Sequence, residues 1–438
     1  MADKQAAGVY VFEVEAKPPM GSVLYKEHLK LTDKSHIAEF AGYLMPLWYS
    51  SISEEHTAVR QHAGVFDCTH MGAIEVSGDE AEPFLNAVTT NKVEGMRLGA
   101  AQYGYILDAG GNVLDDIIVY RRGADRFMVV VNASNEPKIK AYLAAADKYF
   151  TAENAETAEK KQNKFFVKNW REVVSIRDMR DTSPGAPGDC RVDIALQGPA
   201  SLEVLRKLTD DQLVVQRMGT LKSFTFFEAK LAGIDCIISR TGYTGAKVCF
   251  ELFVHPDFAS KMWWRLLDEG KELGVVPCGL GARDSLRIEA GLPLYGHELD
   301  GPYNISPFEA GYGWAVKLDK EFFIGKAAME KIAKSFDMKV ARIELPGEKG
   351  VRPVRQGDGV IIDRVCVGWV LSCANTGERQ VALVYVEKDK ATEGNSVGVY
   401  YLARSDSQRS KGRKQAVERG ERLEADVWGK VVSRFEKF

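Results

Sequence analysis

Two adjacent aspartates lie inside a run of β-prone residues, in the segment Asn112–Tyr120. The preceding segment Gln102–Ile106 is also β-prone, and the turn Asp108–Asn112 between them contains two glycines. This pattern predicts a β-hairpin. Side chains on a strand alternate between its two faces. The residues expected to share a face with Asp116 are Leu114, Ile118 and Tyr120. Asp115 is expected on the opposite face, beside Ile117 and Val119.

At least one of these aspartates therefore lies on an apolar face. Burying a carboxylate is costly unless it is paired or hydrogen-bonded. Two interpretations are open from this pattern alone. The aspartates could face solvent or cap a turn, or one of them could be a functional carboxylate in a protected site.

The composition excludes several classes of function. Of the 438 residues, 45% are hydrophobic and 27% are charged, which predicts a globular chain of two or three domains. With 58 Lys and Arg against 61 Asp and Glu, the net charge of -3 does not indicate nucleic-acid or anionic-membrane binding. No apolar run reaches the roughly 18–20 residues of a membrane helix.

The cysteines and the N-terminus bear on the compartment. Seven cysteines are scattered without CxxC spacing, so we predict neither a zinc site nor another metal site, and no disulfide framework. The N-terminus has no signal-like apolar core, it contains acidic residues, and the first arginine is Arg60. A mitochondrial transit peptide would be rich in arginine and poor in acids. We therefore expect a cytoplasmic protein.

The order of patterns along the chain predicts an α+β fold. Residues 1–22 are expected to form an N-terminal extension, and residues 23–334 a mixed core of two subdomains. A charged stretch, about 148–189, is interpreted as a surface insertion, with a solvated helix over Glu153–Lys164. Regular short strands separated by Gly and Asn turns predict a small β-barrel over residues 335–438.

Other segments carry candidate chemistry. The hexamer Arg240–Gly245 could be a plain hairpin turn or could present Tyr243 outward. Glu251 alternates onto an apolar face of the next strand, where a buried carboxylate and a solvated edge position are both open. Arg283 begins a helix after two glycines, either in a surface ion network or aimed at an anionic ligand. His70 and His297 have no partners at metal-ligand spacing and are interpreted as structural.

Taken together, these segments resemble one family: the aminomethyltransferases, or T-proteins, of the glycine cleavage system. The segments that carry the resemblance, in the family's order, are Ala41–Pro46, Phe66–Gly72, Asp115–Tyr120, Val131–Ala133, Leu196–Pro199, Arg240–Gly245, Cys278–Asp300, Gly313–Lys317 and Phe323–Lys326. They cover the chain from about Leu24 to Val386.

The resemblance implies a three-domain folate-binding fold around a central cavity, ending in a small C-terminal β-barrel. It implies that tetrahydrofolate receives a one-carbon unit from an aminomethyl-lipoyl group on the partner H-protein, with release of ammonia. Asp116 corresponds to the essential aspartate, and Glu251 and Arg283 to folate-recognition residues. The residues that fall where the family lines the folate pocket are Met71, Tyr103, Tyr120, Asn132 and Tyr243.

The chain also departs from the family pattern. The segment Ala246–Cys249 is one residue longer than its usual counterpart, and the charged insertion has no counterpart. One alternative is therefore a tetrahydrofolate-dependent demethylase of a small S-methyl or O-methyl compound. A second is a non-enzymatic folate-binding accessory protein of iron–sulfur assembly. That class carries a Lys-Gly-Cys motif near the position of Ile324–Ala327, where this chain has no cysteine.

Overall fold

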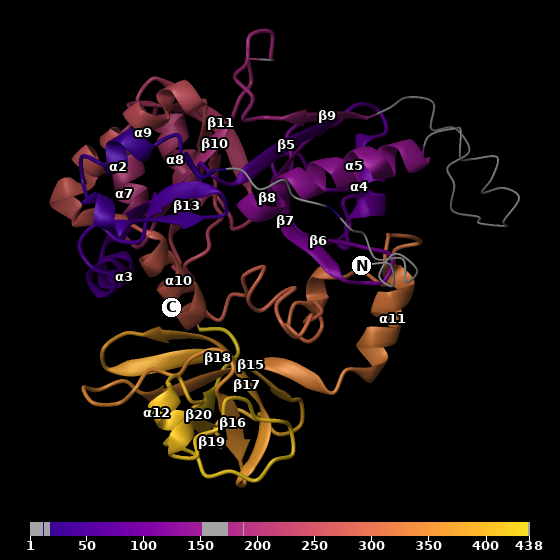
Figure 1. Ribbon diagram of the computed structural model, residues 1–438. Helices are drawn as coiled ribbons and strands as arrows, with labels where there is room; N and C mark the ends of the chain where they lie inside the picture. Colours follow the sequence, from indigo (N-terminus) through magenta and orange to yellow (C-terminus); the bar gives the residue numbers. More distant parts are fainter. Residues whose placement is uncertain (1–11, 13–17, 151–173, 187, 437–438) are drawn as a thin grey trace, which may run out of the picture.

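The computed structural model describes residues 12, 18–150, 174–186 and 188–436. Two lobes, each built on an antiparallel or mixed sheet, lie side by side next to a closed β-barrel (Figure 1). This arrangement confirms the predicted α+β class and the predicted C-terminal barrel. None of the described helices is long and apolar enough to span a bilayer.

The first lobe is a five-stranded sheet with two covering helices. In spatial order its strands are β6 (Ala101–Leu107), β7 (Val113–Arg121), β8 (Arg126–Val131), β5 (Gly72–Ser77) and β9 (Ser175–Asp178). The helices α4 (Ala81–Val88) and α5 (Glu136–Phe150), the latter preceded by η2 (Ala133–Asn135), cover one face. Their apolar residues, among them Phe84, Leu85 and Leu143, pack on the strands because each helix has one apolar stripe.

The predicted hairpin of β6 and β7 is confirmed, with one correction. Tyr105 pairs with Asp116 and Ile106 with Asp115, but Leu107 then pairs with Val113. This β-bulge leaves one extra residue in β7. Leu114 consequently packs with the helices in the same apolar cluster as Ile117 and Val119, not on the face of Asp116 as predicted.

The second lobe is a six-stranded sheet. Its strands, in spatial order, are β11 (Phe226–Leu231), β12 (Ile234–Ser239), β13 (Cys249–Val254), β10 (Val192–Gln197), β4 (Ala63–Asp67) and β14 (Val275–Cys278). Its outer face is covered by α7 (Ser201–Arg206), α8 (Gln212–Thr220) and α9 (Pro256–Gly270), which is followed by η3 (Lys271–Leu273). Trp263 of α9 is fully buried in this layer.

Smaller elements complete the second lobe. The helices α3 (Ile52–Gln61) and α10 (Leu280–Ala290) pack on the inner face of β4 and β10. A three-stranded sheet of β1 (Met20–Gly21), β3 (Tyr43–Pro46) and β2 (Ile37–Phe40) adjoins α2 (Tyr25–His28) and η1 (Lys34–His36). Residues Met20 and Gly21 of the predicted extension thus pair with the core.

The inner faces of the two large sheets pack against each other. Met128 and Tyr120 of the first sheet share one buried cluster with Phe226, Ile237 and Phe253 of the second. This contact leaves no solvent layer between the sheets where they meet. Polar side chains on these inner faces are therefore buried and must find partners within the interface.

The barrel closes through its last strand. Its order is β15 (Met338–Pro346), β18 (Arg379–Glu387), β17 (Val365–Asn375), β16 (Gly359–Ile362), β19 (Ser396–Tyr400) and β20 (Val427–Val432), and β20 returns to β15. The helix α11 (Lys326–Ser335) leads into it, and the short α12 (Asp406–Ser410) is drawn at the left of the barrel in Figure 1. We did not predict β20, because its Gly429 and Lys430 interrupt the apolar pattern.

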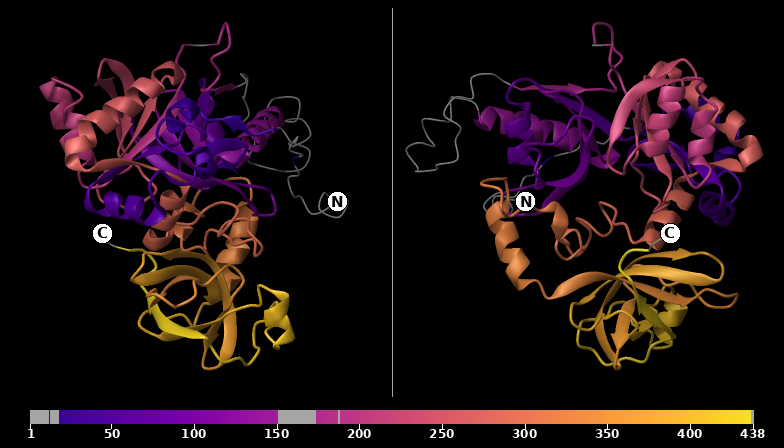
Figure 2. Two further views of the ribbon diagram at one scale, coloured as in Figure 1. Left: turned by 60° about the vertical axis from the view of Figure 1, so that its left-hand side comes forward. Right: turned by 180° about the vertical axis from the view of Figure 1, so that it is seen from behind.

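The segment 291–325, which includes η4 (Gly313–Ala315), crosses between the lobes and the barrel (Figure 2). Glu298 fixes it, accepting hydrogen bonds from Arg287 of α10 (2.6 Å), from the backbone N–H of Leu294 (3.0 Å) and from Ser372 of the barrel. The C-terminal segment also packs here, since Arg434 donates to the carbonyl oxygens of Gly291 and Ala310. One buried carboxylate thus connects α10 of the second lobe, the segment 291–325 and the barrel.

The predicted surface insertion is wrong at its C-terminal end. The expected helix Glu153–Lys164 lies outside the described residues. Ser175–Asp178, however, forms β9 and pairs with β5 as an edge strand of the first sheet. Its charged residues suggested solvent exposure, but Arg177 pairs with the carboxylate of Glu75 at 3.1 Å.

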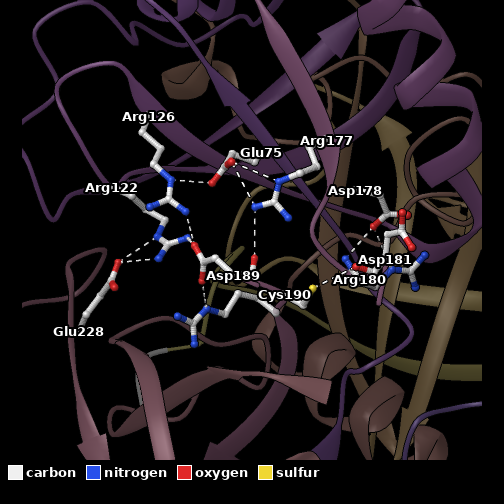
Figure 3. A network of polar contacts seen from close by, with 11 residues as sticks. Glu75, Arg122, Arg126, Arg177, Asp178, Arg180, Asp181, Asp189, Cys190 and Glu228 are labelled. Atoms are coloured by element: carbon white, nitrogen blue, oxygen red, sulfur yellow. Dashed lines mark hydrogen bonds and ion pairs between the residues drawn. The ribbon is translucent and has the colours of Figure 1, made fainter. Parts of the chain in front are cut away.

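Asp189 joins the two lobes through arginines (Figure 3). Its carboxylate accepts from Arg122 at 2.7 Å and Arg191 at 2.7 Å, and also from Arg126. Arg122 in turn pairs with Glu228 of the second sheet at 2.8 Å. Burial alone would raise the pKa of Asp189, but the surrounding guanidinium groups hold it down at about 2.

We predict that Asp189→Asn lowers the melting temperature at pH 7. A lowered carboxyl pKa contributes stability above the unfolded-state value and loses it as the pH falls. The difference between wild type and variant should therefore shrink between about pH 4 and pH 2, as followed by thermal unfolding. Asp235→Asn, at a largely exposed carboxylate 4.0 Å from Lys230, is the control and should change little. An equal effect of both variants would contradict the role of Asp189.

Candidate functional site

Two adjoining cavities lie where the inner faces of the sheets meet α10 and the segment 291–325. We call the smaller, of about 160 Å³, the Asp116 cavity, and the larger, of about 280 Å³, the His70 cavity. They share five wall residues: Met71, Asn132, Tyr243, Arg283 and Leu294. Strands from both sheets, a helix and a loop therefore converge on one enclosed region.

The structure brings together nearly all the residues singled out from the sequence. Those that line the Asp116 cavity are Met71, Tyr103, Asp116, Asn132, Tyr243, Glu251 and Arg283. Tyr120 does not line either cavity. It is fully buried behind the wall, where its ring packs against Phe226 and Phe253 and its hydroxyl donates to Glu251 at 3.4 Å.

The aspartate pair is held by asparagine side chains. The Nδ2 group of Asn132 donates to Oδ1 of Asp115 and to Oδ1 of Asp116, both at 2.8 Å. Asp115 also accepts from the backbone N–H of Asn132 at 3.0 Å and from Asn135 at 2.6 Å. Asn132 precedes η2, but its side chain does not cap that helix, and its amide bridges the two carboxyls instead.

Only one of the two aspartates reaches the cavity. Asp115 is fully buried behind it, whereas Asp116 lines it and accepts a hydrogen bond from the hydroxyl of Tyr103 at 2.9 Å. Burial and the charge of Asp116 raise the pKa of Asp115 to about 8. Burial likewise raises the pKa of Asp116, against the hydrogen bonds from Tyr103 and Asn132. The pair therefore holds a proton more readily than free aspartates do.

Aromatic rings form the wall next to Asp116. Tyr103 packs edge-on against Tyr105 at 5.3 Å between ring centroids, and it lies 5.4 Å from Tyr312 and 6.0 Å from Trp314. Trp314 is half exposed at the mouth of the cavity, with 52% of its surface accessible. These rings offer flat apolar surfaces to a planar ligand.

The opposite wall combines a carboxyl with a guanidinium. Glu251 of β13 accepts from the hydroxyl of Thr241, and burial raises its pKa. Arg283 projects from the first turn of α10, lies 5.4 Å from the ring centre of Tyr243, and donates to the sulfur of Cys68. The hydroxyl of Tyr243 donates to the carbonyl of Pro293, which fixes that ring between the two cavities.

Several wall residues were missed or interpreted differently in the sequence. Asp193, Tyr312 and Trp314 line the Asp116 cavity. Asp193 alternates with the core residues Ile194 and Leu196, so strand periodicity would have placed it on the inner face. His70, interpreted as structural, lines the other cavity and packs edge-on against Phe40.

The histidines near the site do not provide a ready base or metal ligand. Burial and the charge of Arg283 lower the pKa of His70 to about 3, so this ring is neutral. His297 lies at the exposed end of the His70 cavity. Within the described part of the chain, no group of three or more His, Cys, Asp or Glu side chains could hold a metal ion. Chemistry here depends on carboxyls, a guanidinium and aromatic rings.

Comparisons with known proteins show which family this chain is similar to. The GCVT N-terminal domain family matches residues 24–320. An aminomethyltransferase of Halalkalibacterium halodurans is 37% identical over 84% of this chain and 90% of that protein. One of Streptomyces avermitilis is 38% identical over 83% of this chain and 89% of that protein. The crystal structure of the glycine cleavage system aminomethyltransferase T from Bartonella henselae is similar with a TM-score of 0.71 and 28% identity, covering 95% of this chain and 98% of that one.

We predict that Asn132→Ala destabilises the fold by on the order of 2 kcal/mol, because it removes the shared donor of two buried carboxyls. Thermal unfolding at pH 7 would measure the change. Asn395→Ala is the control, since its Nδ2 lies 3.5 Å from the carbonyl of Lys390 at the surface. If Asn132→Ala and the control have the same melting temperature, the Asn132 amide does not stabilise the pair of aspartates.

Proposed function

The chain belongs to the aminomethyltransferase family, the T-proteins of the glycine cleavage system, and we propose that it transfers the methylene of an aminomethyl-lipoyl group to tetrahydrofolate. Ammonia is released in this reaction. The donor group is carried by the lipoylated H-protein, and the acceptor binds in the Asp116 cavity. The observation that carries the proposal is the position of Asp116, a partly buried carboxyl beside aromatic rings and opposite Glu251 and Arg283.

The residues present fit a reduced folate. Its pterin contains a flat pyrimidine ring with an edge of N–H donors next to a carbonyl oxygen. Tyr103, Tyr243 and Trp314 supply aromatic surfaces, Glu251 can accept from N–H groups, and the guanidinium of Arg283 can donate to a carbonyl oxygen. When bound, tetrahydrofolate supplies the nitrogens that accept the one-carbon unit, N5 of its ring and N10 beside it.

Asp116 is suited to act at these nitrogens. The two hydrogen bonds from Tyr103 and Asn132 fix its carboxyl in one orientation. A carboxylate fixed in a buried site offsets the positive charge that develops as an amine is lost, without the cost of reorienting water. It can also accept or return a proton, since burial raises its pKa from the usual value of free aspartate.

Asp115 acts through Asn132 and does not contact the cavity. Its carboxyl anchors both the amide and the backbone N–H of Asn132. The amide then holds Asp116. We therefore assign Asp115 a positioning role, which explains why two adjacent aspartates occur in one strand although only one reaches the reacting atoms.

The donor must arrive on an extended arm, because Asp116 lies within an enclosed cavity. The adjoining His70 cavity offers a passage, since it shares Tyr243, Asn132 and Arg283 with the Asp116 cavity. A lipoyl arm of a partner H-protein meets this requirement, whereas a demethylase of a small free compound would not need it. The scattered cysteines, none of them at CxxC spacing, support a cytoplasmic setting for this proposal.

We predict that the wild type binds (6S)-5-methyltetrahydrofolate with a measurable heat of binding in isothermal titration. Absence of heat at high micromolar ligand would overturn the folate assignment.

We further predict that Asp116→Asn lowers kcat for methylene transfer from aminomethylated H-protein by roughly a hundredfold or more. Folate affinity should change far less, because Glu251 and Arg283 remain. Asp115→Asn should lose less activity, since it acts through Asn132. Equal losses in the two variants would contradict the assignment of Asp116 to the reacting centre.

A further inference from the structure

Asp193 is a third carboxyl in the wall of the Asp116 cavity, besides Asp116 and Glu251. In β10, Ile194 and Leu196 point to the outer helices and belong to their apolar cluster. Asp193 and Ala195 therefore face inward. Because Ala195 pairs with Glu251 of β13, Asp193 lies diagonal to Glu251 on the same face of the sheet. Two carboxyls thus come close together in one cavity.

The fold does not explain this carboxyl. Asp193 is 5% exposed, and among the described residues no group donates a hydrogen bond to its Oδ1 atom. Arg283 is the cation that acts on it, while Glu251 and Asp67 add negative charge. A buried acceptor without a donor typically costs about 1–3 kcal/mol. An aspartate at this position weakens the protein unless something else supplies the donor.

The chemistry of the wall indicates which ligand group would supply it. Asp193 and Glu251 offer acceptors side by side, and Arg283 offers donors next to them. A complementary ring edge carries an exocyclic amino group and a ring N–H beside a carbonyl oxygen. One carboxyl can accept from the amino group and the ring N–H together, which leaves a second amino N–H without a partner.

We propose that Asp193 accepts this remaining N–H, so that Asp193 and Glu251 together hold the 2-amino-4-oxopyrimidine edge of the ligand. This inference rests on the proposed function, and it assigns to Asp193 the selection for ligands that carry the exocyclic amino group. Asp193 is then a binding residue, whose contribution is to affinity and not to turnover.

The test compares two ligands across three proteins by isothermal titration. The ligands are 5-methyltetrahydrofolate and its 2-desamino analogue. The proteins are the wild type, Asp193→Leu and Asp147→Asn. Asp147 is the matched control, a 5% exposed carboxyl on α5 that lines neither cavity. Leucine at 193 keeps the branching at Cγ in a larger side chain and removes the buried acceptor.

We expect the wild type and Asp147→Asn to bind the desamino analogue roughly a hundredfold more weakly than the parent ligand. The analogue lacks the amino group, so the carboxyl oxygens that would accept from it stay unpaired. In Asp193→Leu this ratio should fall below about tenfold. Without ligand, Asp193→Leu should melt at or above the wild-type temperature, since an unpartnered buried carboxyl has been removed.

Three results would decide against the inference. An unchanged ratio in Asp193→Leu would overturn the role of Asp193 while leaving the folate assignment intact. Failure of Asp193→Leu to fold would show that Asp193 has a structural partner and would also overturn the inference. In that case Asp193→Asn would be measured with the same two ligands, and only a loss of its preference for the parent ligand would restore the inference. If the wild type binds neither ligand, both this inference and the proposed function are wrong.

Discussion

The burial of ionisable groups between two sheets is the constraint on which the rest of the structure depends. Asp116, Asp193 and Glu251 enter one cavity from strands of both sheets, and Arg283 is the cation among them. Charges in such a place are expensive unless they are paired. For Asp116 and Glu251 the protein meets this cost with hydrogen bonds from neutral groups, chiefly the Asn132 amide and hydroxyls of tyrosine and threonine. Among the described residues, Asp193 receives no such bond at its Oδ1 atom. The bonds to Asp116 and Glu251 fix these two carboxyls in place, and a fixed carboxyl is what the proposed chemistry requires.

The barrel contributes to the site from a distance. It contributes no strand to the cavity, but it secures the segment 291–325 that forms one wall. Glu298 receives hydrogen bonds from α10, from that segment and from Ser372 of the barrel. Arg342 of the barrel reaches back to the carbonyl of Glu289 at 2.6 Å. The barrel therefore helps to hold Pro293 and Leu294 of this segment beside Tyr243.

Strand periodicity and motif order went far toward this account, and their failures have physical causes. Alternation placed Asp116 and Tyr120 on the same face of their strand, and the structure agrees. It misplaced Leu114, because a bulge of one residue cannot be read from apolar pattern alone. Residues Ser175–Asp178 were mistaken for part of a solvated insertion, since their charges pair with partners distant in sequence. Periodicity would have placed Asp193 on the inner face, but that it lies near Glu251 follows only from the pairing of β10 with β13.

A crystal structure of the chain with bound (6S)-5-methyltetrahydrofolate tests the central claim most directly. The account predicts the pterin ring in the Asp116 cavity, with its N5 side toward the Asp116 carboxyl and its amino-pyrimidine edge toward Glu251. Tyr103 and Tyr243 should contact the ring. A pterin bound in the His70 cavity, or one turned so that the amino-pyrimidine edge faces Asp116, would contradict the assignment of roles to these carboxyls.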